Sequence, residues 1–448
     1  MAQHLVKEGN DYAAAFRMLS ERAVRHEPSW LQRAREDAFT RFERGGFPTV
    51  HDEDWKYTNV ASIGKSQFTP AVVAGPPPIE SGALESFAHE EARGSRLVFV
   101  NGIYQRRLSS IEALPTFVRV LDLGESGELG HCESIVREHF ERDKSEPNDG
   151  FLDLNTALFS GGLLLVIPKG LTVPPPIDLQ FISTSSNGHG PAAFPRVLIV
   201  AEQNSAATII ESYASAHGGA YFTNAVIELT LDAGARLKHF KVQRESNGAF
   251  HIASTKVELG PNANYESTTV NLGAAISRHG IDVMMDHEGA ECRVDGLYMV
   301  DGNQHTDTHS MIDHRQPHCS SQQLYKGILD GKSHAVFNGK VFVRHGAQQT
   351  VAHQTNKNLL LSNEARVDTK PQLEIFADDV KCAHGAAVGQ LEADEIFYLE
   401  SRGIRPDLAR NLLTYGFAEE VIEQIKIDSI RRELDAVVLN RLHAELET

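Results

Sequence analysis

Cysteine is scarce in this sequence, and that scarcity excludes several classes of protein. The 448 residues contain four cysteines, Cys132, Cys292, Cys319 and Cys382, and no two of them form a CxxC pair. So few cysteines in so long a chain do not build the disulfide framework of a small secreted domain. The first residues, MAQHLVKEGNDYAAAF, also lack the apolar stretch of a signal peptide. We therefore expect a protein of the reducing cytoplasm.

An excess of positive charge, long apolar runs and nucleotide-binding loops are lacking as well. The formal net charge of −17 argues against a nucleic-acid-binding surface, which needs a basic face, and against anionic membranes. Apolar runs such as residues 163–167 are far too short to span a bilayer. The sequence has no Walker A loop, GxSxG elbow or GxGxxG fingerprint, so it does not hydrolyse ATP by a P-loop route.

Between about residues 150 and 388, short runs rich in Val, Ile, Leu and Thr are broken every few residues by Gly, Asn, Asp or Pro. A turn of one form, a small residue followed by alanine and a polar residue, returns at Ala235, Ala263, Ala290, Ala347 and Ala365. These alanines are about 27 residues apart in the first half of the region and about 18 apart in the second, which is a loose rather than a strict period. A sandwich, a barrel or a β-helix fits these strands, and the recurring turn favours the β-helix, with equivalent residues stacked coil upon coil.

Helical patterns lie at the two ends of the chain. Before residue 45, apolar residues recur at helix spacing, and residues 131–142 predict a further short helix. After residue 391, Pro406 suits a first helical turn. One apolar stripe there consists of Leu408, Leu412, Leu413 and Phe417, and a second of Ile422, Ile425, Ile430, Leu434, Val437 and Leu442. The end of a solenoid offers little area for two helices, so part of these stripes is free to face either the chain itself or a partner protein.

A cysteine and a histidine share one face near the end of the last β-like segment. In Lys381-Cys382-Ala383-His384-Gly385, the residues at i and i+2 of a strand point the same way. A thiolate beside an imidazole suits zinc, copper and iron–sulfur centres, and Lys381 is placed to favour the thiolate. The alternative is a buried small cysteine beside a solvent-facing histidine, and the triplet alone favours that simpler interpretation.

Two other groups of residues predict different chemistry. Histidines 305, 309, 314 and 318, followed by Cys319, suggest a zinc site if they are helical, but Pro317 and the polar neighbours favour strands. On strands, His305, Asp307 and His309 form a polar ladder on the exterior. Carboxylates at Asp282, Asp286 and Asp295 suggest a carbohydrate-active β-helix enzyme, although their spacing singles out no pair for acid–base work.

Several motifs in order resemble those of the SufB/SufD family of iron–sulfur cluster assembly proteins. The C-terminal signature is matched by residues 378–386 (DDVKCAHGA) and 397–404 (FYLESRGI), and the N-terminal one by Trp55-Lys56-Tyr57-Thr58. Residues 325–329 (YKGIL) and 354–361 (QTNKNLLL) resemble the core blocks of the family. The resemblance covers essentially the whole chain. It implies a right-handed parallel β-helix at 151–388, after an N-terminal helical and mixed region at 1–150 and before a C-terminal helical domain at 389–448.

The resemblance also implies a function and partners. The glycine after Cys382-Ala383-His384, where SufB-type chains have a glutamate, indicates the SufD-type branch. Such a chain is a non-catalytic scaffold that pairs with SufB through the end of the β-helix and with the SufC ATPase through its C-terminal helices, where the second apolar stripe is expected to face SufC. His384 and then Cys382 become the residues expected at a nascent cluster. One thiolate and one imidazole do not complete a cluster's ligand set, so a cluster is expected only transiently, shared with SufB. Self-pairing of the isolated chain is a further expectation.

Overall fold

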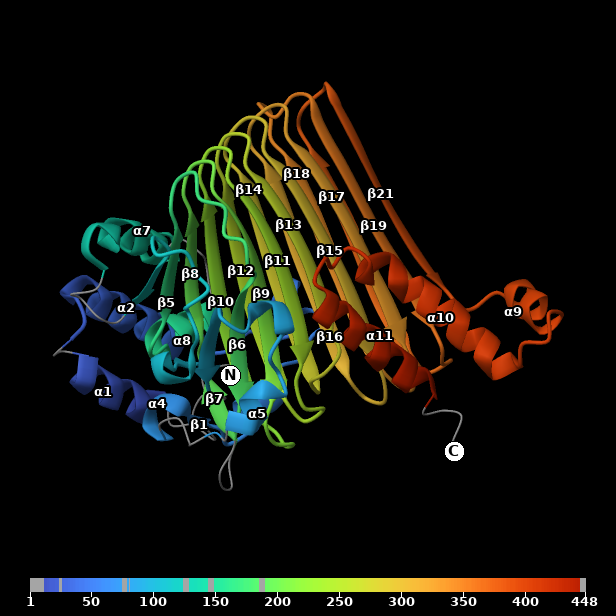
Figure 1. Ribbon diagram of the computed structural model, residues 1–448, viewed down its shortest axis with the longest axis horizontal. Coiled ribbons are helices and arrows are strands. Elements are labelled where there is room, and N and C mark those ends of the chain that lie inside the picture. The colour runs from blue at the N-terminus through green and yellow to red at the C-terminus, as the bar shows by residue number, and fades with distance from the viewer. Residues whose placement is uncertain are drawn as a thin grey trace.

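The structure, a computed structural model, describes residues 12–23, 26–74, 79, 81–123, 129–143, 149–184 and 190–443. Two long sheets face each other, and the chain passes from one to the other at each turn, so every coil adds a strand to both (Figure 1). Among the described strands, all pairings along the coils are parallel. The predicted β-helix is therefore confirmed as a flattened parallel solenoid.

We call the two sheets A and B and give their strands in spatial order. Sheet A consists of β4 (Arg119–Asp122), β5 (Leu163–Ile167), β8 (Arg196–Ala201), β10 (Phe222–Leu231), β12 (Phe250–Leu259), β14 (Ile276–Met285), β16 (His305–His314), β18 (His334–Val343) and β20 (Arg366–Ile375). In addition, β7 (Pro191–Ala193) pairs with β10, and β1 (Thr69–Pro70) pairs with β7. Sheet B consists of β3 (Ile103–Tyr104), β2 (Arg96–Val100), β6 (Ile177–Ser183), β9 (Ala206–Ser215), β11 (Arg236–Arg244), β13 (Asn264–Asn271), β15 (Glu291–Val300), β17 (Ser320–Leu329), β19 (Thr350–Leu360) and β21 (Val380–Gly389). The pairs β2–β3 and β4–β5 are antiparallel.

The turn alanines explain the loose period of the sequence. Ala235, Ala263 and Ala290 are fully buried, and each directly precedes a strand of sheet B, so the interval between them is one coil. Cys319 takes the same position one coil later and is also buried. Ala347 and Ala365 lie before β19 and β20, which belong to different sheets. The interval of about 18 residues in the second half therefore runs from a turn before a strand of sheet B to a turn before a strand of sheet A, and it is shorter than one coil.

Inward-pointing side chains of neighbouring coils stack in register. Tyr298 lies beside Gly327, and Tyr325 lies beside Gly296, in adjacent strands of sheet B. A Cβ atom added at Gly327 would come within 2.1 Å of the Tyr298 ring, and one at Gly296 within 2.2 Å of the Tyr325 ring. Glycine at these two positions therefore makes the room in which each tyrosine ring lies along the ladder.

Helices near the N-terminus cover the outer face of sheet A. They are α1 (Tyr12–Ala23), α2 (Ser29–Gly45), α3 (Ala61–Lys65), α4 (Ala71–Ala74), α7 (Glu133–Asp143) and α8 (Gly150–Leu158). Helix α5 (Ser81–Glu85) instead packs on the outer face of sheet B, where Leu84 lies in one cluster with Val98, Val100 and Ile182. Apolar side chains such as Leu31, Phe42 and Phe140 pack with outward-facing residues of the sheet such as Leu198. The predicted helices before residue 45 and at 131–142 are confirmed within the described residues.

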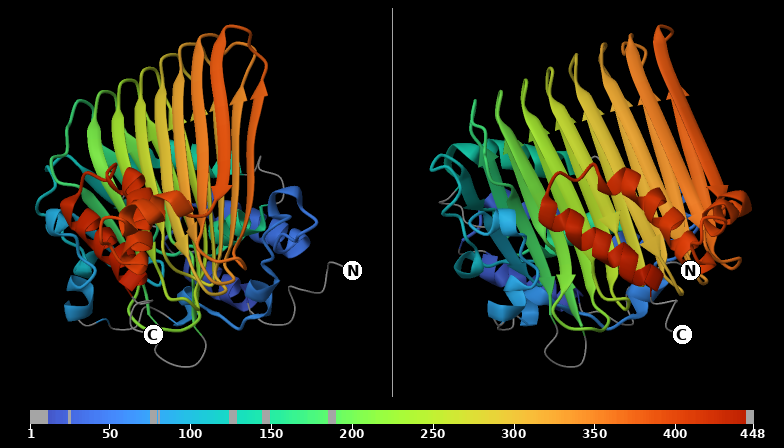
Figure 2. Two further views of the ribbon diagram at one scale, coloured as in Figure 1. Left: turned by 90° about the vertical axis from the view of Figure 1, so that its right-hand side faces the viewer. Right: turned by 45° about the vertical axis from the view of Figure 1, so that its right-hand side comes forward.

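The C-terminal helices are α9 (Ala393–Glu400), α10 (Pro406–Ile422) and α11 (Asp428–His443). Helices α10 and α11 lie across the outer face of sheet B, whereas α9 projects beyond the solenoid (Figure 1; Figure 2, right). The second apolar stripe faces this chain and not a partner, because Ile422, Ile425, Ile430 and Leu434 are buried against Phe240, Val242, Val270 and Leu297. Val437 is half-buried in the same cluster, and the side chain of Leu442 lies outside the described residues.

No helix in the described part of the chain is both long and apolar enough to cross a membrane.

Candidate functional site

Cys382 and His384 lie on β21, the last strand of sheet B. The register places them beside Ala352 and Gln354 of β19, both of which point into the solenoid and are buried. Cys382 and His384 therefore also face inward, as the strand alternation predicted. They are more exposed than their neighbours because no further coil stacks on them: Cys382 is half-buried and His384 is exposed. The CxH pair thus stands at the open end of the interior (Figure 2, left).

The environment of Cys382 favours its thiol form. The sulfur packs against an apolar cluster that contains Val341, Val343 and Ala352. Burial raises the pKa of the Cys382 thiol, and the backbone of Ala352 opposes this shift only in part. Lys381 occupies the opposite face of the strand and is exposed. The expectation that Lys381 favours the thiolate is therefore wrong for this chain on its own, and a metal or a partner is needed to remove the proton.

Beneath His384, a row of polar side chains continues into the solenoid. Gln354 donates from Nε2 to Oε1 of Gln323 at 2.7 Å, and Gln323 donates to the hydroxyl of Ser310 at 2.8 Å. All three residues are buried. The Oε1 atom of Gln354 has no hydrogen-bond partner among the described residues, so a buried acceptor lies at the strand position next to His384. The end of the interior is thus polar as well as open.

Large apolar side chains surround the same end. Ile375 and Phe376, at the end of β20, are 40% and 47% exposed, and Val388 of β21 is 47% exposed. An exposed edge strand such as β21 also carries backbone N–H and C=O groups that are free to pair with another chain.

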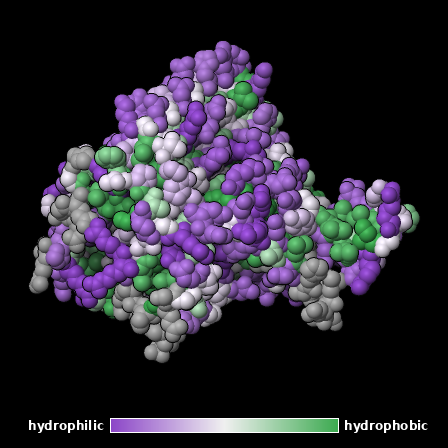
Figure 3. Space-filling model, in the orientation of Figure 1, coloured by the Kyte–Doolittle hydropathy of each residue, from purple (hydrophilic) through white to green (hydrophobic). Residues whose placement is uncertain are grey.

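A second exposed apolar surface lies on the C-terminal helices. Phe397 and Tyr398 of α9 are 68% and 56% exposed, and Leu408 and Leu412 of α10 are 40% and 43% exposed. Figure 3 shows the corresponding hydrophobic patch on the projecting lobe that contains α9. The first stripe of the sequence is therefore partly uncovered, whereas Ile422, Ile425, Ile430 and Leu434 of the second are buried.

The predicted histidine run does not converge on a metal site. His305 and His309 of β16 point outward, as the strand interpretation expected, whereas His314 points inward and donates to or accepts from Ser321 Oγ at 2.8 Å. His318 lies in a turn with φ +60°, 3.5 Å from Glu288. Cys319 is buried in the core. Within the described ranges, no three or more His, Cys, Asp or Glu side chains are grouped to hold a metal ion.

The three aspartates proposed for carbohydrate cleavage also lie apart. Asp282 is on β14 of sheet A, and Asp286 pairs with Arg315 at 2.7 Å in the following turn. Asp295 is on sheet B, where it accepts from Arg293 at 2.6 Å and from the backbone of Leu324 at 3.0 Å. It lines a cavity of about 350 Å³ on the outer face of that sheet. Since Asp295 is already bonded, these residues do not supply a pair of carboxylates for glycoside hydrolysis.

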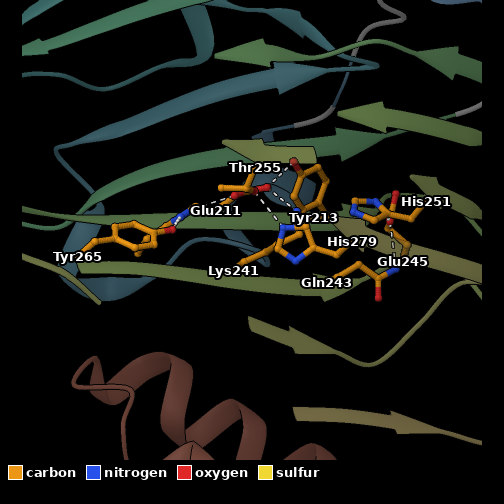
Figure 4. A network of polar contacts seen from close by, with 10 residues as sticks. Glu211, Tyr213, Lys241, Gln243, Glu245, His251, Thr255, Tyr265 and His279 are labelled. Atoms are coloured by element: carbon orange, nitrogen blue, oxygen red, sulfur yellow. Dashed lines mark hydrogen bonds and ion pairs between the residues drawn. The ribbon is translucent and has the colours of Figure 1, made fainter. Parts of the chain in front are cut away.

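A network of buried charges in the middle of the solenoid was not found from the sequence. Glu211 accepts from Lys241 at 2.5 Å, from Tyr213 at 2.6 Å and from His239 at 2.8 Å, all inside the solenoid (Figure 4). Burial alone would raise the pKa of Glu211, but Lys241 and His239 hold it well below its usual value. Glu211 and Lys241 are in register on β9 and β11, so knowledge of the coil period would have brought them together.

Comparison with protein families agrees with this geometry. The model of the SUF system FeS cluster assembly SufBD core domain matches residues 181–417, and that of the SufBD protein N-terminal region matches residues 6–179. This chain belongs to the SufBD family. The resemblance noted from the sequence motifs is therefore confirmed at the level of the family.

Curated relatives of this SufBD chain match over most of its length. An iron–sulfur cluster assembly SufBD family protein of Synechocystis sp. is 38% identical over 395 residues, 86% of each chain. The iron–sulfur cluster assembly protein SufD of Escherichia coli is 33% identical over 401 residues, which cover 89% of this chain and 90% of the relative. The chloroplastic protein ABCI7 of Arabidopsis thaliana is 31% identical over 412 residues, 90% of this chain and 84% of the relative.

Proposed function

We propose that this SufBD chain is a non-catalytic scaffold subunit for iron–sulfur cluster assembly, of the SufD type. In this proposal it pairs with a SufB-type chain through the open end of the solenoid and with the SufC ATPase through its C-terminal helices. The similarity to SufD of Escherichia coli over nine-tenths of the chain supports the branch. The cytoplasmic location expected from the sequence is part of the same proposal.

One observation carries the proposal: the CxH pair faces inward on a strand that no further coil covers. A partner that continues the solenoid would bury Ile375, Phe376 and Val388 and would bring its own side chains next to Cys382 and His384. Iron–sulfur clusters are held by four protein ligands, mostly thiolates, and this end supplies one thiol and one imidazole. The remaining ligands come from the partner, so a cluster is shared, transient and absent from the isolated chain.

Docking of the ATPase is proposed on α9 and the first half of α10. The exposed side chains Phe397, Tyr398, Leu408 and Leu412 form the apolar surface there. The rest of the C-terminal region is already engaged, since α11 is tied to sheet B by the Arg244–Glu433 pair, and Lys326 of β17 donates to the carbonyl of Phe417 at 2.9 Å. Motion of an ATPase bound at this surface would therefore pass directly to sheet B, which ends in β21.

A carbohydrate-active enzyme, the alternative considered from the sequence, has no supporting observation in this chain. The three aspartates lie apart, and Arg315 and Arg293 neutralise two of them.

The docking surface is tested by changing exposed residues rather than by deleting the helices, because a deletion of α10 and α11 would uncover the apolar face of sheet B. The double variant Leu408→Glu with Leu412→Glu is expected to lose co-purification with SufC. Leu439→Glu is the matched control, because Leu439 is 37% exposed on α11, outside the proposed surface. Retention of SufC by the folded double variant would refute the docking assignment.

A further inference from the structure

Gln354 of β19 carries a hydrogen-bond acceptor without a partner at the open end of the solenoid. The side chain is 1% exposed, and its Oε1 atom is closed to solvent and receives no donor from the described residues. A buried acceptor of this kind has lost its bond to water and gained none in return, which destabilises the folded chain. It therefore calls for a donor that is not yet in place.

The amide group of Gln354 is held by the coil that precedes it. Its Nε2 atom donates to Oε1 of Gln323 at 2.7 Å, and Gln323 in turn donates to the hydroxyl of Ser310 at 2.8 Å. On the facing strand β18, a Cβ atom added at Gly339 would come within 2.4 Å of the same Nε2 atom, so glycine leaves room for the amide there. Because Nε2 is engaged, Oε1 is the atom that remains for a further bond.

His384 is the neighbouring side chain best placed to supply the donor. It lies beside Gln354 in register on β21, one strand spacing of about 4.8 Å away. Its imidazole has at least one N–H, and no hydrogen bond of this ring is present in the described part of the chain. Two other inward-facing neighbours do not serve: Asn356 already donates to Tyr298 at 3.2 Å, and the weakly donating thiol of Cys382 packs among apolar side chains.

A hydrogen bond to one ring nitrogen of His384 decides the state of the other. If Gln354 accepts the N–H of one nitrogen, that nitrogen keeps its proton and the other presents a lone pair. Histidine ligands of metal ions are generally held in this way, by a hydrogen bond from the second nitrogen to an oxygen acceptor. In the isolated chain the ring is exposed, so water competes for its N–H.

We propose that Gln354 is a positioning residue for His384. Once a partner covers the open end, the ring donates one N–H to Oε1 of Gln354 and directs its other nitrogen toward the site of cluster formation. This inference rests on the proposed function, because the cover is the SufB-type partner. Gln323 and Ser310 hold the amide from behind, so the acceptor is in place before the partner binds.

Two substitutions of Gln354 separate positioning from stability. Gln354→Met removes the acceptor at nearly constant volume, whereas Gln354→Glu keeps an acceptor and adds a buried charge. The glutamate is accommodated when Gln323 turns its amide, donates to the new carboxylate and accepts from the hydroxyl of Ser310. A purely structural role makes methionine the milder change, because burying a charge costs more than losing a hydrogen bond. A positioning role reverses that order for the state of His384.

The measurement uses the full chain, labelled with nitrogen-15 histidine and assembled with its SufB-type and SufC partners, before iron and sulfide are added. Solid-state nitrogen NMR distinguishes a protonated ring nitrogen from one with a lone pair, and the signals that His384→Gln removes belong to His384. The parent complex and Gln354→Glu should each show a single form of this ring. Gln354→Met should show both tautomers, because nothing then selects between the nitrogens. Cluster formation should fall about 10–100-fold in Gln354→Met and recover in Gln354→Glu.

Gln243→Met is the matched control, since Gln243 is also a buried glutamine inside the solenoid but lies on β11, where it donates to Glu245 at 3.0 Å (Figure 4). It should leave the His384 signals unchanged. If the Gln354→Met complex does not assemble, Gln354→Leu takes its place. A single unchanged tautomer in the intact Gln354→Met complex would overturn the proposal, and so would a Gln354→Glu variant that restores nothing. Failure of the proposed function gives a different result, cluster formation that survives His384→Ala.

Discussion

The two ends of the solenoid are built differently. At the N-terminal end, the antiparallel strands β3 and β4 close the two sheets, and inward residues such as Leu97, Phe99 and Leu165 are completely buried. At the C-terminal end, β20 and β21 have no such cover, and the inward-facing Val388 remains 47% exposed. A solenoid buries its core only between neighbouring coils, so its last coil needs either a cap or a partner. The N-terminal end is thus closed within this chain, and the difference supports our proposal that a partner chain completes the C-terminal end.

The lining of the interior also changes along the solenoid, from apolar at the N-terminal end to polar at the C-terminal end. Near the N-terminus it is lined by leucine, isoleucine and phenylalanine, in the middle it holds the Glu211–Lys241 pair, and at the open end it holds Gln323, Gln354 and His384. Glu211 in the middle is sealed and accepts from Lys241, Tyr213 and His239, whereas Gln354 at the open end keeps a buried acceptor without a partner among the described residues.

Breaking the sealed charge network is expected to have the largest effect. Lys241→Met leaves Glu211 buried without its main counter-charge and should destabilise the chain by about 3–5 kcal/mol. The double variant Glu211→Leu with Lys241→Met should recover most of that loss, because it leaves no unpaired charge. Equilibrium urea unfolding of both proteins measures the difference. A double variant no more stable than the single one would contradict the role given to the pair.

A matched pair of leucines compares the two ends directly. Leu165 of β5 is fully buried, and Leu373 of β20 faces the same interior but is only half-buried. Leu165→Ala should cost about 2–5 kcal/mol in unfolding free energy, and Leu373→Ala distinctly less, because less area leaves water at the open end. Bound to a SufB-type partner, the Leu373 variant should lose more than it does alone. If the two variants lost equal unfolding free energy in the isolated chain, the C-terminal end of the interior would be as well covered as the N-terminal end, contrary to our proposal.

A buried carboxyl group at the capped end should also make the free energy of unfolding depend on pH. Asp178 of β6 is fully buried, and burial raises its pKa to about 7 against the opposing effects of Arg244, Ser212 and Arg96. An unfolded aspartate has a pKa of about 3.9, so the folded chain binds an extra proton between these values and loses stability as pH rises from about 4 to 7.

The change amounts to about 1.4 kcal/mol for each unit between the two pKa values. Asp178→Asn has no titrating carboxyl group, so the parent chain should lose stability relative to the variant as pH rises through that range. Urea unfolding at a series of pH values measures it, and a difference that stays constant would show that Asp178 titrates normally.

Much of the fold could be predicted from the sequence because its signals are local. The turn form around Ala235, Ala263 and Ala290 marks real coils, and the strand alternation correctly placed Cys382 and His384 on one face. Contacts between side chains on neighbouring coils could not be predicted, because that requires the exact number of residues in each coil. The pairing of His305 with His334 and of Glu211 with Lys241 joins residues about one coil apart, which the irregular turn spacing obscured.

The C-terminal helices show a further limit. An apolar stripe indicates that a helix face is buried, but it does not indicate which surface covers that face. The second stripe, with Ile422, Ile430 and Leu434, covers sheet B of the same chain, and the expectation of a partner there was wrong. The exposed Leu408 and Leu412 belong to the first stripe, and only the packed structure distinguishes the two.

The variant His384→Ala is the sharpest test of our proposal that the open end supplies ligands to a cluster completed by a partner. The variant is assembled with SufB and SufC chains, and the intact complex is verified before iron and sulfide are supplied. Because His384 is exposed and has no cavity to leave behind, its loss should spare folding and assembly. Cluster formation, followed by the visible absorption of the cluster, should be lost or strongly reduced. Unchanged cluster formation on an intact complex would contradict it.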